Sequence, residues 1–163
     1  KKTALYYAVI NKDIKMINLL LEHGADINSE NNDGINPLLL SVKNNDINLV
    51  KLLLINGANP NATIIGRENA FRIAIYSNAD INIAKLLLKA GCNPYDKFHE
   101  WSPMECAIQS ARYKYVKLLL DYDRNLHIYH EHMIFSGSCY KRDKEKTLNI
   151  RFLLVLVLNG FKP

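Results

Sequence analysis

One pattern of apolar and polar positions recurs along the chain. Leucine-rich segments, in which apolar residues return at three- and four-residue steps, occupy 14–21, 47–54, 81–88 and 114–120. This spacing predicts an amphipathic helix at each place. Gly24, Gly57 and Gly91 follow the first three segments, where glycine supplies the left-handed conformation that ends a helix. The chain is therefore predicted to repeat one helical unit.

A second pattern precedes each leucine-rich segment. Four short polar residues, suited to cap a helix N-terminus, lie 33 residues apart at Thr3, Asn36, Asn69 and Ser102. Pro37 and Pro103 then take the first helical position, where a missing N–H costs nothing. A short helix should follow each cap. It carries a small residue in register at Ala8, Ser41, Ala74 and Ala107, which lets neighbouring helices approach closely.

Two short antiparallel helices with a projecting turn, repeated every 33 residues, resemble the ankyrin repeat. The strings that carry the resemblance include Asn36-Pro37-Leu38 and Gly24-Ala25-Asp26-Ile27-Asn28. The resemblance covers essentially the whole chain and implies an all-α solenoid of helix–turn–helix units with projecting β-turns. We expect a single domain over 1–163, with clear repeats at about 1–31, 32–64, 65–97 and 98–125 and an atypical fifth at 126–163. Because Lys1 is not an initiator Met, we expect a fragment of a longer chain.

Departures from the family pattern are also visible. The family's usual histidine, two residues after the proline, is replaced by Tyr6, Leu39, Arg72 and Glu105. The third repeat carries an extra residue around 76–79, and Asp123 stands where the fourth should end in glycine. The segment 137–146 is an insertion that the resemblance does not cover.

Composition and charge exclude several classes of function. The 163 residues are 48% apolar and 23% charged, with a net charge of +5, typical of a folded, soluble protein. The longest apolar run, 152–158, is far shorter than the ~20 residues of a membrane span. The basic excess is too small and scattered to indicate nucleic-acid binding. Three widely separated cysteines indicate a reducing, cytoplasmic location rather than a disulfide framework.

Candidate chemistry is sparse. His127, His130, His132 and Cys139 could be read as a metal site, but they lack zinc-finger and metalloprotease spacing, and partly exposed histidines of a degenerate helix explain them better. No phosphate loop or nucleophile motif is present, so we expect no enzyme activity, no cofactor and no metal. The basic run 141–146 contains interleaved acids and is interpreted as a solvated loop. The leucines at 19–21 and the thiols Cys92 and Cys106 are interpreted as core.

What remains is surface. In ankyrin proteins, turn tips and exposed inner-helix positions form a concave binding face. Carrying this over position by position gives turn candidates Asn32, Asp33, Ile35, Ile64, Ile65, Arg67, Phe98, His99 and Trp101. The inner-helix candidates are Ile10, Asn11, Lys43, Asn44, Tyr76, Ser77, Gln109 and Ser110. We expect Trp101 to be an energetic centre of binding, although it could instead cover the junction of repeats 3 and 4.

The resemblance implies a non-enzymatic module that binds a partner protein. Relatives include adaptors, substrate receptors of ubiquitin ligases and viral host-range proteins. No SOCS-box or F-box sequence is evident, so ligase recruitment would depend on regions outside this chain. The alternative is a regulatory or tethering segment of a larger channel or enzyme. The family also implies hydroxylation of turn asparagines, here Asn28 and Asn61, although a purely structural capping role is the simpler interpretation.

Overall fold

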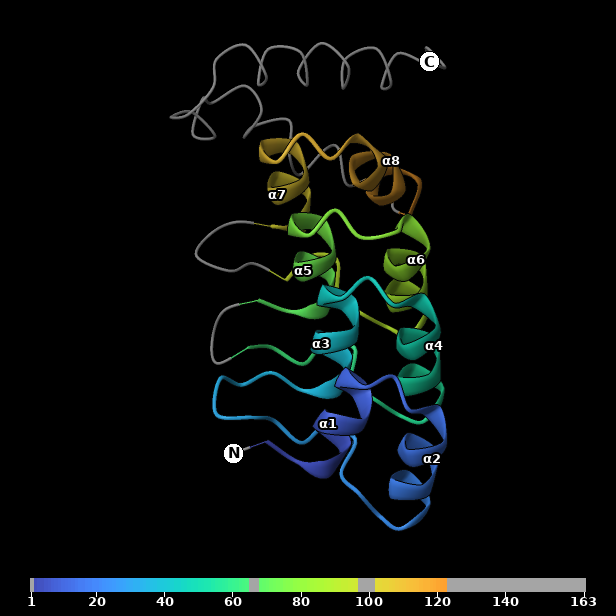
Figure 1. Cartoon of the computed structure of the whole chain (residues 1–163). Coiled ribbons are helices and arrows are strands. Elements are labelled where there is room, and N and C mark those ends of the chain that lie inside the picture. The colour runs from blue at the N-terminus through green and yellow to red at the C-terminus, as the bar shows by residue number, and fades with distance from the viewer. Residues whose placement is uncertain (1, 65–67, 97–101, 123–163) are drawn as a thin grey trace. The chain divides into compact units, whose positions relative to one another are not determined.

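Short helices in antiparallel pairs make up the described part of the chain (Figure 1). The computed structural model describes residues 2–64, 68–96 and 102–122. Their helices are α1 (Ala4–Ile10), α2 (Ile14–Glu22), α3 (Pro37–Lys43), α4 (Ile47–Ile55), α5 (Ala70–Tyr76), α6 (Ile81–Lys89), α7 (Pro103–Gln109) and α8 (Tyr113–Tyr122). The predicted all-α, helix–turn–helix architecture is confirmed. Two compact units are distinguished, residues 1–103 and 104–163.

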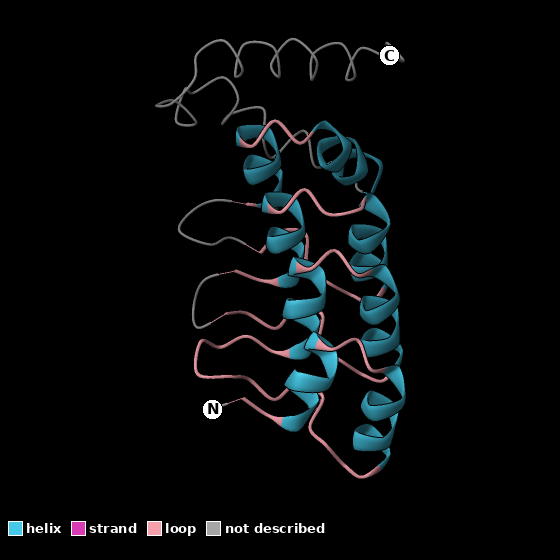
Figure 2. Cartoon of the chain, viewed as in Figure 1, coloured by secondary structure: helices cyan, strands magenta, loops and turns pink. Residues whose placement is uncertain are grey.

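Within the first unit, the inner helices α1, α3 and α5 lie on one side and the outer helices α2, α4 and α6 on the other (Figures 1 and 2). Each inner helix contacts the outer helix of its own pair, and also the next inner helix along the chain. The connecting turns project beyond the inner helices. The surface of inner helices and turns is therefore distinct from the surface of outer helices.

The predicted caps form. Thr3 Oγ1 accepts a hydrogen bond from the Tyr6 N–H at 3.2 Å, and Asn36 Oδ1 accepts one from the Leu39 N–H at 2.8 Å. Asn69 acts in the same way at the start of α5. The glycines at the ends of the first three outer helices have φ angles of +80°, +87° and +90° for Gly24, Gly57 and Gly91. Both helix-start and helix-stop signals were correctly interpreted.

The loop from each inner to each outer helix contains a left-handed residue that is not glycine. These residues are Lys12, Asn45, Asn78 and Ala111, with φ between 52° and 55°. The extra residue of the third repeat is placed here. The Ala79 N–H donates to the Ala74 carbonyl at 2.9 Å, as the Asp46 N–H does to the Ser41 carbonyl. Ala79 therefore takes the backbone position of the aspartate caps, and the cap of α6 shifts to Asp80.

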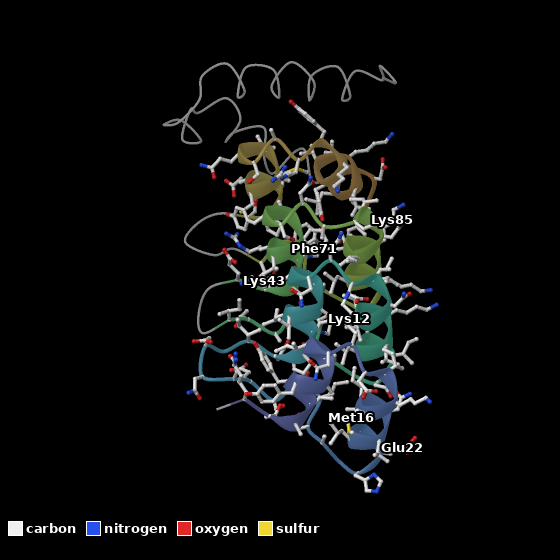
Figure 3. All side chains as sticks on the ribbon, in the orientation of Figure 1. Lys12, Met16, Glu22, Lys43, Phe71 and Lys85 are labelled. Carbon is white, nitrogen blue, oxygen red and sulfur yellow. The ribbon has the colours of Figure 1, made fainter. Side chains whose placement is uncertain are left out.

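The core of the first unit lies between the two layers of helices. Ser41 and Ala74 are fully buried at the predicted close-approach positions, and Leu53 and Leu87 are fully buried on the outer helices. Phe71, labelled in Figure 3, is also fully buried. In the second unit, residues of α7 and α8 are buried in the same pattern, including Cys106, Ala107, Tyr115 and Leu119.

One prediction about the core is wrong. Leu19 on α2 was expected to be buried but is 48% exposed, and Met16 beside it is 44% exposed. At the register position of Met16, Leu49 is only 2% exposed. The difference arises because Leu49 packs in a cluster with Leu5 and other residues of the first repeat. Among the described residues, none covers the corresponding side of α2.

Candidate functional site

The predicted binding residues divide into two groups. Ile65, Arg67, Phe98, His99 and Trp101 lie outside the described residues. Asn32, Ile35 and Tyr76 belong to the first unit, and the exposed Gln109 belongs to the second. The site is therefore built here from the first unit.

Three residues at the ends of successive inner helices form an exposed column. Ile10, Lys43 and Tyr76 end α1, α3 and α5, and each is separated from the next by 33 residues. Ile10 is 42% exposed, Tyr76 is 40% exposed and Lys43 is also exposed. Since packed helices lie about 8–10 Å apart, the column presents one side chain at roughly that interval. We call these three residues the inner-helix column.

Tyr76 is supported from within its own helix. Arg72, one turn earlier, is only 4% exposed. Its Nη2 lies 3.4 Å from the Tyr76 hydroxyl, and its Cζ lies 5.8 Å from the ring centroid. A guanidinium over an aromatic face is attracted to the ring's negative quadrupole. The arrangement restrains the exposed ring and adds positive charge beside it, a role that the sequence did not reveal for Arg72.

The second turn is held by one buried asparagine. Asn31 Oδ1 accepts hydrogen bonds from the N–H groups of Asp33 and Ile35, both at 2.9 Å, and the Asn31 N–H donates to the Ile35 carbonyl. The turn therefore presents Asn32 and Asp33 to solvent in a fixed geometry. Ile35 differs from expectation, because it is half-buried against the hydrophobic cluster of the first two repeats.

Positive charge predominates on the inner-helix side. Within α1, α3 and α5 there is no Asp or Glu. Lys12 Nζ, just after α1, lies 2.8 Å from Asp46 Oδ2 and is neutralised by it. Burial raises the pKa of Asp46, but hydrogen bonds from Lys12 and the Leu49 N–H, with the Lys12 charge, outweigh burial and hold that pKa below its ordinary value. Lys43 has no ion pair within the described part of the chain (Figure 3).

The two asparagines predicted to be modified link consecutive repeats. Asn28 Oδ1 accepts a hydrogen bond from the Asn59 N–H at 2.8 Å, and Asn61 Oδ1 accepts one from the Asn93 N–H at 2.8 Å. Asn61 Nδ2 also donates to the Gly91 carbonyl at 3.0 Å. Both asparagines are exposed. This ladder was not predicted, because its partners lie 30 to 32 residues apart.

Reactive chemistry does not gather in the described residues. They hold no group of His, Cys, Asp and Glu side chains that could bind a metal ion. The earlier metal candidates His127, His130, His132 and Cys139 lie outside them. Cys92 is buried, and burial together with the nearby Asp96 charge raises its thiol pKa to about 12. In the same part of the chain, no helix has the length and apolar character needed to cross a membrane.

Comparison with known proteins agrees with the repeat pattern. A family model described as "Ankyrin repeats (3 copies)" matches residues 1–64 and 38–130. Among curated proteins, the chain is similar to human "Ankyrin repeat and SOCS box protein 2", with 36% identity over 75 residues. That match covers 46% of this chain but only 11% of the human protein. The chain thus corresponds to a small part of this relative.

Proposed function

Because the chain belongs to the ankyrin-repeat family, which generally mediates protein–protein interaction, we propose that it binds a partner protein through its inner helices and turns. The module acts without catalysis. The proposed surface comprises the inner-helix column, the second turn with Asn32, and the candidates that lie outside the described residues.

The observation that carries the proposal is the inner-helix column itself. Ile10 and Tyr76 are large apolar side chains that remain exposed beside a well-packed core. They lie in the same register on contacting helices, with Lys43 between them. Tyr76 is restrained by Arg72, and the second turn is restrained by Asn31. Restrained groups lose little conformational entropy on binding, which favours affinity.

The role of the module in a larger assembly is a further part of the proposal. We favour an adaptor, of the substrate-receptor or host-range type, over a regulatory or tethering segment of a channel or enzyme. The name of the human relative joins ankyrin repeats to a SOCS box, which supports a ubiquitin-ligase link through regions outside this chain. The free thiols Cys92 and Cys106 suit a reducing, intracellular location.

Affinity purification from cells with matched variants tests the binding surface. One variant changes the inner-helix column to Ile10→Ser, Lys43→Gln and Tyr76→Ser. The control changes the equivalent exposed column of the outer helices, Asn18→Ser, Lys51→Gln and Lys85→Gln. We expect one set of partners to be recovered with the wild type and the control and lost with the inner-helix variant. Identical recovery with all three proteins contradicts the proposal.

The same purification tests the adaptor role when it is repeated with the longer natural protein. Recovery of a cullin with the longer protein, but not with residues 1–163, supports the substrate-receptor assignment. If the longer protein instead contains a channel or catalytic domain whose activity changes when the repeats are deleted, the regulatory alternative is correct.

Hydroxylation at the ladder asparagines is a separate proposal. Asn28 is the better substrate, because it is exposed and follows the acidic Asp26, whose carboxylate accepts its backbone N–H at 2.9 Å. Asn61 has Asn59 at that place. We expect mass spectrometry, after co-expression with an asparaginyl hydroxylase, to find one added oxygen on the Asn28 peptide and less on that of Asn61. An unmodified Asn28 peptide contradicts the proposal.

A further inference from the structure

The inner-helix column also indicates the chemistry of the partner, on the premise that the proposed function is correct. Lys43 is an exposed cation between an aliphatic residue, Ile10, and an aromatic one, Tyr76. We infer that the column binds a protein segment in which a carboxylate is flanked on both sides by apolar side chains.

The first argument is charge complementarity. Lys12, the lysine nearest to α1 in the connecting loop, is already neutralised by Asp46. Lys43 has no such partner among the described residues, and the buried Arg72 guanidinium lies beside Tyr76. With no acid on α1, α3 or α5, the field over the column is positive. A partner carboxylate would supply the missing countercharge.

The acidic groups of this unit lie elsewhere. On the turns and the segments leading to them are Glu30, Asp33, Glu68 and Asp96. Their charge repels a partner carboxylate from the turn side and favours its placement at the helix ends, near Lys43. Complementary and opposing charges of this kind determine specificity and orientation more than raw affinity.

The second argument is spacing. Neighbouring helices lie about 8–10 Å apart, and this separation fixes the interval between the groups that the column contacts. In an extended segment, three residues span about 10 Å. In a helical segment, seven residues span about 10.5 Å. The recognised pattern is therefore apolar, acidic, apolar, at intervals of three in an extended partner or seven in a helical one.

Selection from a displayed random peptide library tests this inference on the full chain. The wild type is compared with Lys43→Glu and with Lys51→Glu, which makes the same charge change on the exposed side of α4. We expect the wild type and Lys51→Glu to enrich peptides with Asp or Glu between apolar residues at one of the two intervals. Lys43→Glu should lose that preference and enrich Lys or Arg at the same place.

Binding of one enriched peptide, labelled with a fluorophore, supplies the magnitude. An exposed ion pair accounts for a few-fold in affinity, and like charges add repulsion. We expect Lys43→Glu to weaken binding about tenfold, and a peptide with its acid changed to the amide to lose about two- to fivefold. Raising the salt from about 0.1 M to 1 M, which shortens the screening length from about 10 to 3 Å, should remove the difference between acid and amide peptides.

The outcomes separate this inference from the function on which it rests. If enriched peptides lose binding in Tyr76→Ser but show no acidic preference and are unaffected by Lys43→Glu, the inference is overturned and the binding surface stands. If no peptide is enriched, or if enriched peptides bind all inner-helix variants as well as the wild type, both are overturned. Thermal unfolding of each variant checks that Lys43→Glu folds as Lys51→Glu does.

Discussion

A single missing hydrogen bond in the second repeat should be restorable by one substitution. The Asn36 side chain is 1% exposed, and its Oδ1 caps α3, but its Nδ2 has no hydrogen-bond partner. In the first repeat, the equivalent Thr3 Oγ1 lies 3.5 Å from Ser29 Oγ. In the third, Asn69 Nδ2 donates to Asp96 Oδ2 at 3.3 Å. A cap residue therefore normally bonds to the turn of the same repeat.

The sequence explains the missing partner. Ser29 and Asp96 occupy one register position, and the residue at that position in the second repeat is Ala62. A methyl group cannot accept a hydrogen bond, so the buried Asn36 amide group remains unpaired. Ala62→Asp should place a carboxylate acceptor as Asp96 does, and Ala62→Ser should place a hydroxyl as Ser29 does.

The size of the gain follows from the cost of an unpaired donor. An unsatisfied buried polar group costs about 1–3 kcal/mol, and a hydrogen bond contributes about 0.5–1.5 kcal/mol net. Ala62 is half-buried, so part of the gain from a new carboxylate is offset by its desolvation. We expect Ala62→Asp to raise the free energy of unfolding by about 1 kcal/mol and Ala62→Ser by about half as much. For a protein of this length, that is a rise in Tm of about 2–4 °C.

A double-mutant cycle in denaturant unfolding identifies the bond. Asn36→Thr retains a capping oxygen, as Thr3 shows at its equivalent position, but removes the amide donor. If the reasoning is correct, Ala62→Asp stabilises the wild type and gives little or nothing in the Asn36→Thr background. A gain of equal size in both backgrounds, or no gain in either, refutes it.

Three further predictions concern packing, ionisation and binding. Leu49→Ala should cost about 2–5 kcal/mol, whereas Met16→Ala at the same register position should cost less than about 1 kcal/mol because Met16 is 44% exposed; urea unfolding of both variants checks this. Because the thiol pKa of Cys92 is about 12 when folded against an ordinary 9.0, the unfolded chain loses this proton first. Stability should therefore fall between about pH 9 and 12, and less in Cys92→Ala. Trp101→Ala should weaken partner binding by about 2 kcal/mol or more with a smaller effect on Tm; a large loss of Tm without a binding defect contradicts it.

Much of the fold could be predicted because the repeat places the same local signal at the same position several times. Thr3, Asn36 and Asn69 are weak caps individually, but a spacing of 33 makes them a consistent pattern. The exposure of Leu19 could not be predicted in this way. Periodicity identifies the apolar face of a helix, whereas burial depends on whether another repeat packs against that face.

The site was only partly predictable for a related reason. The positions of Lys43 and Tyr76 follow from the register, and both are exposed as expected. The support of Tyr76 by Arg72 was missed, because a replacement of the family's histidine does not show where the new side chain points. The ladder through Asn28 and Asn61 was missed because hydrogen bonds between repeats leave no local pattern.

The central claim is that partners bind the inner helices and turns rather than the outer helices. Site-specific photocrosslinking in cells tests it most directly, with a photoreactive phenylalanine analogue introduced singly at positions 10, 43 and 76. Matched control positions are 18, 51 and 85, which are exposed and share one register on the outer helices. We predict that one partner crosslinks from the inner positions and not from the controls. Crosslinking of that partner from the outer positions alone, or equally from both columns, contradicts the account.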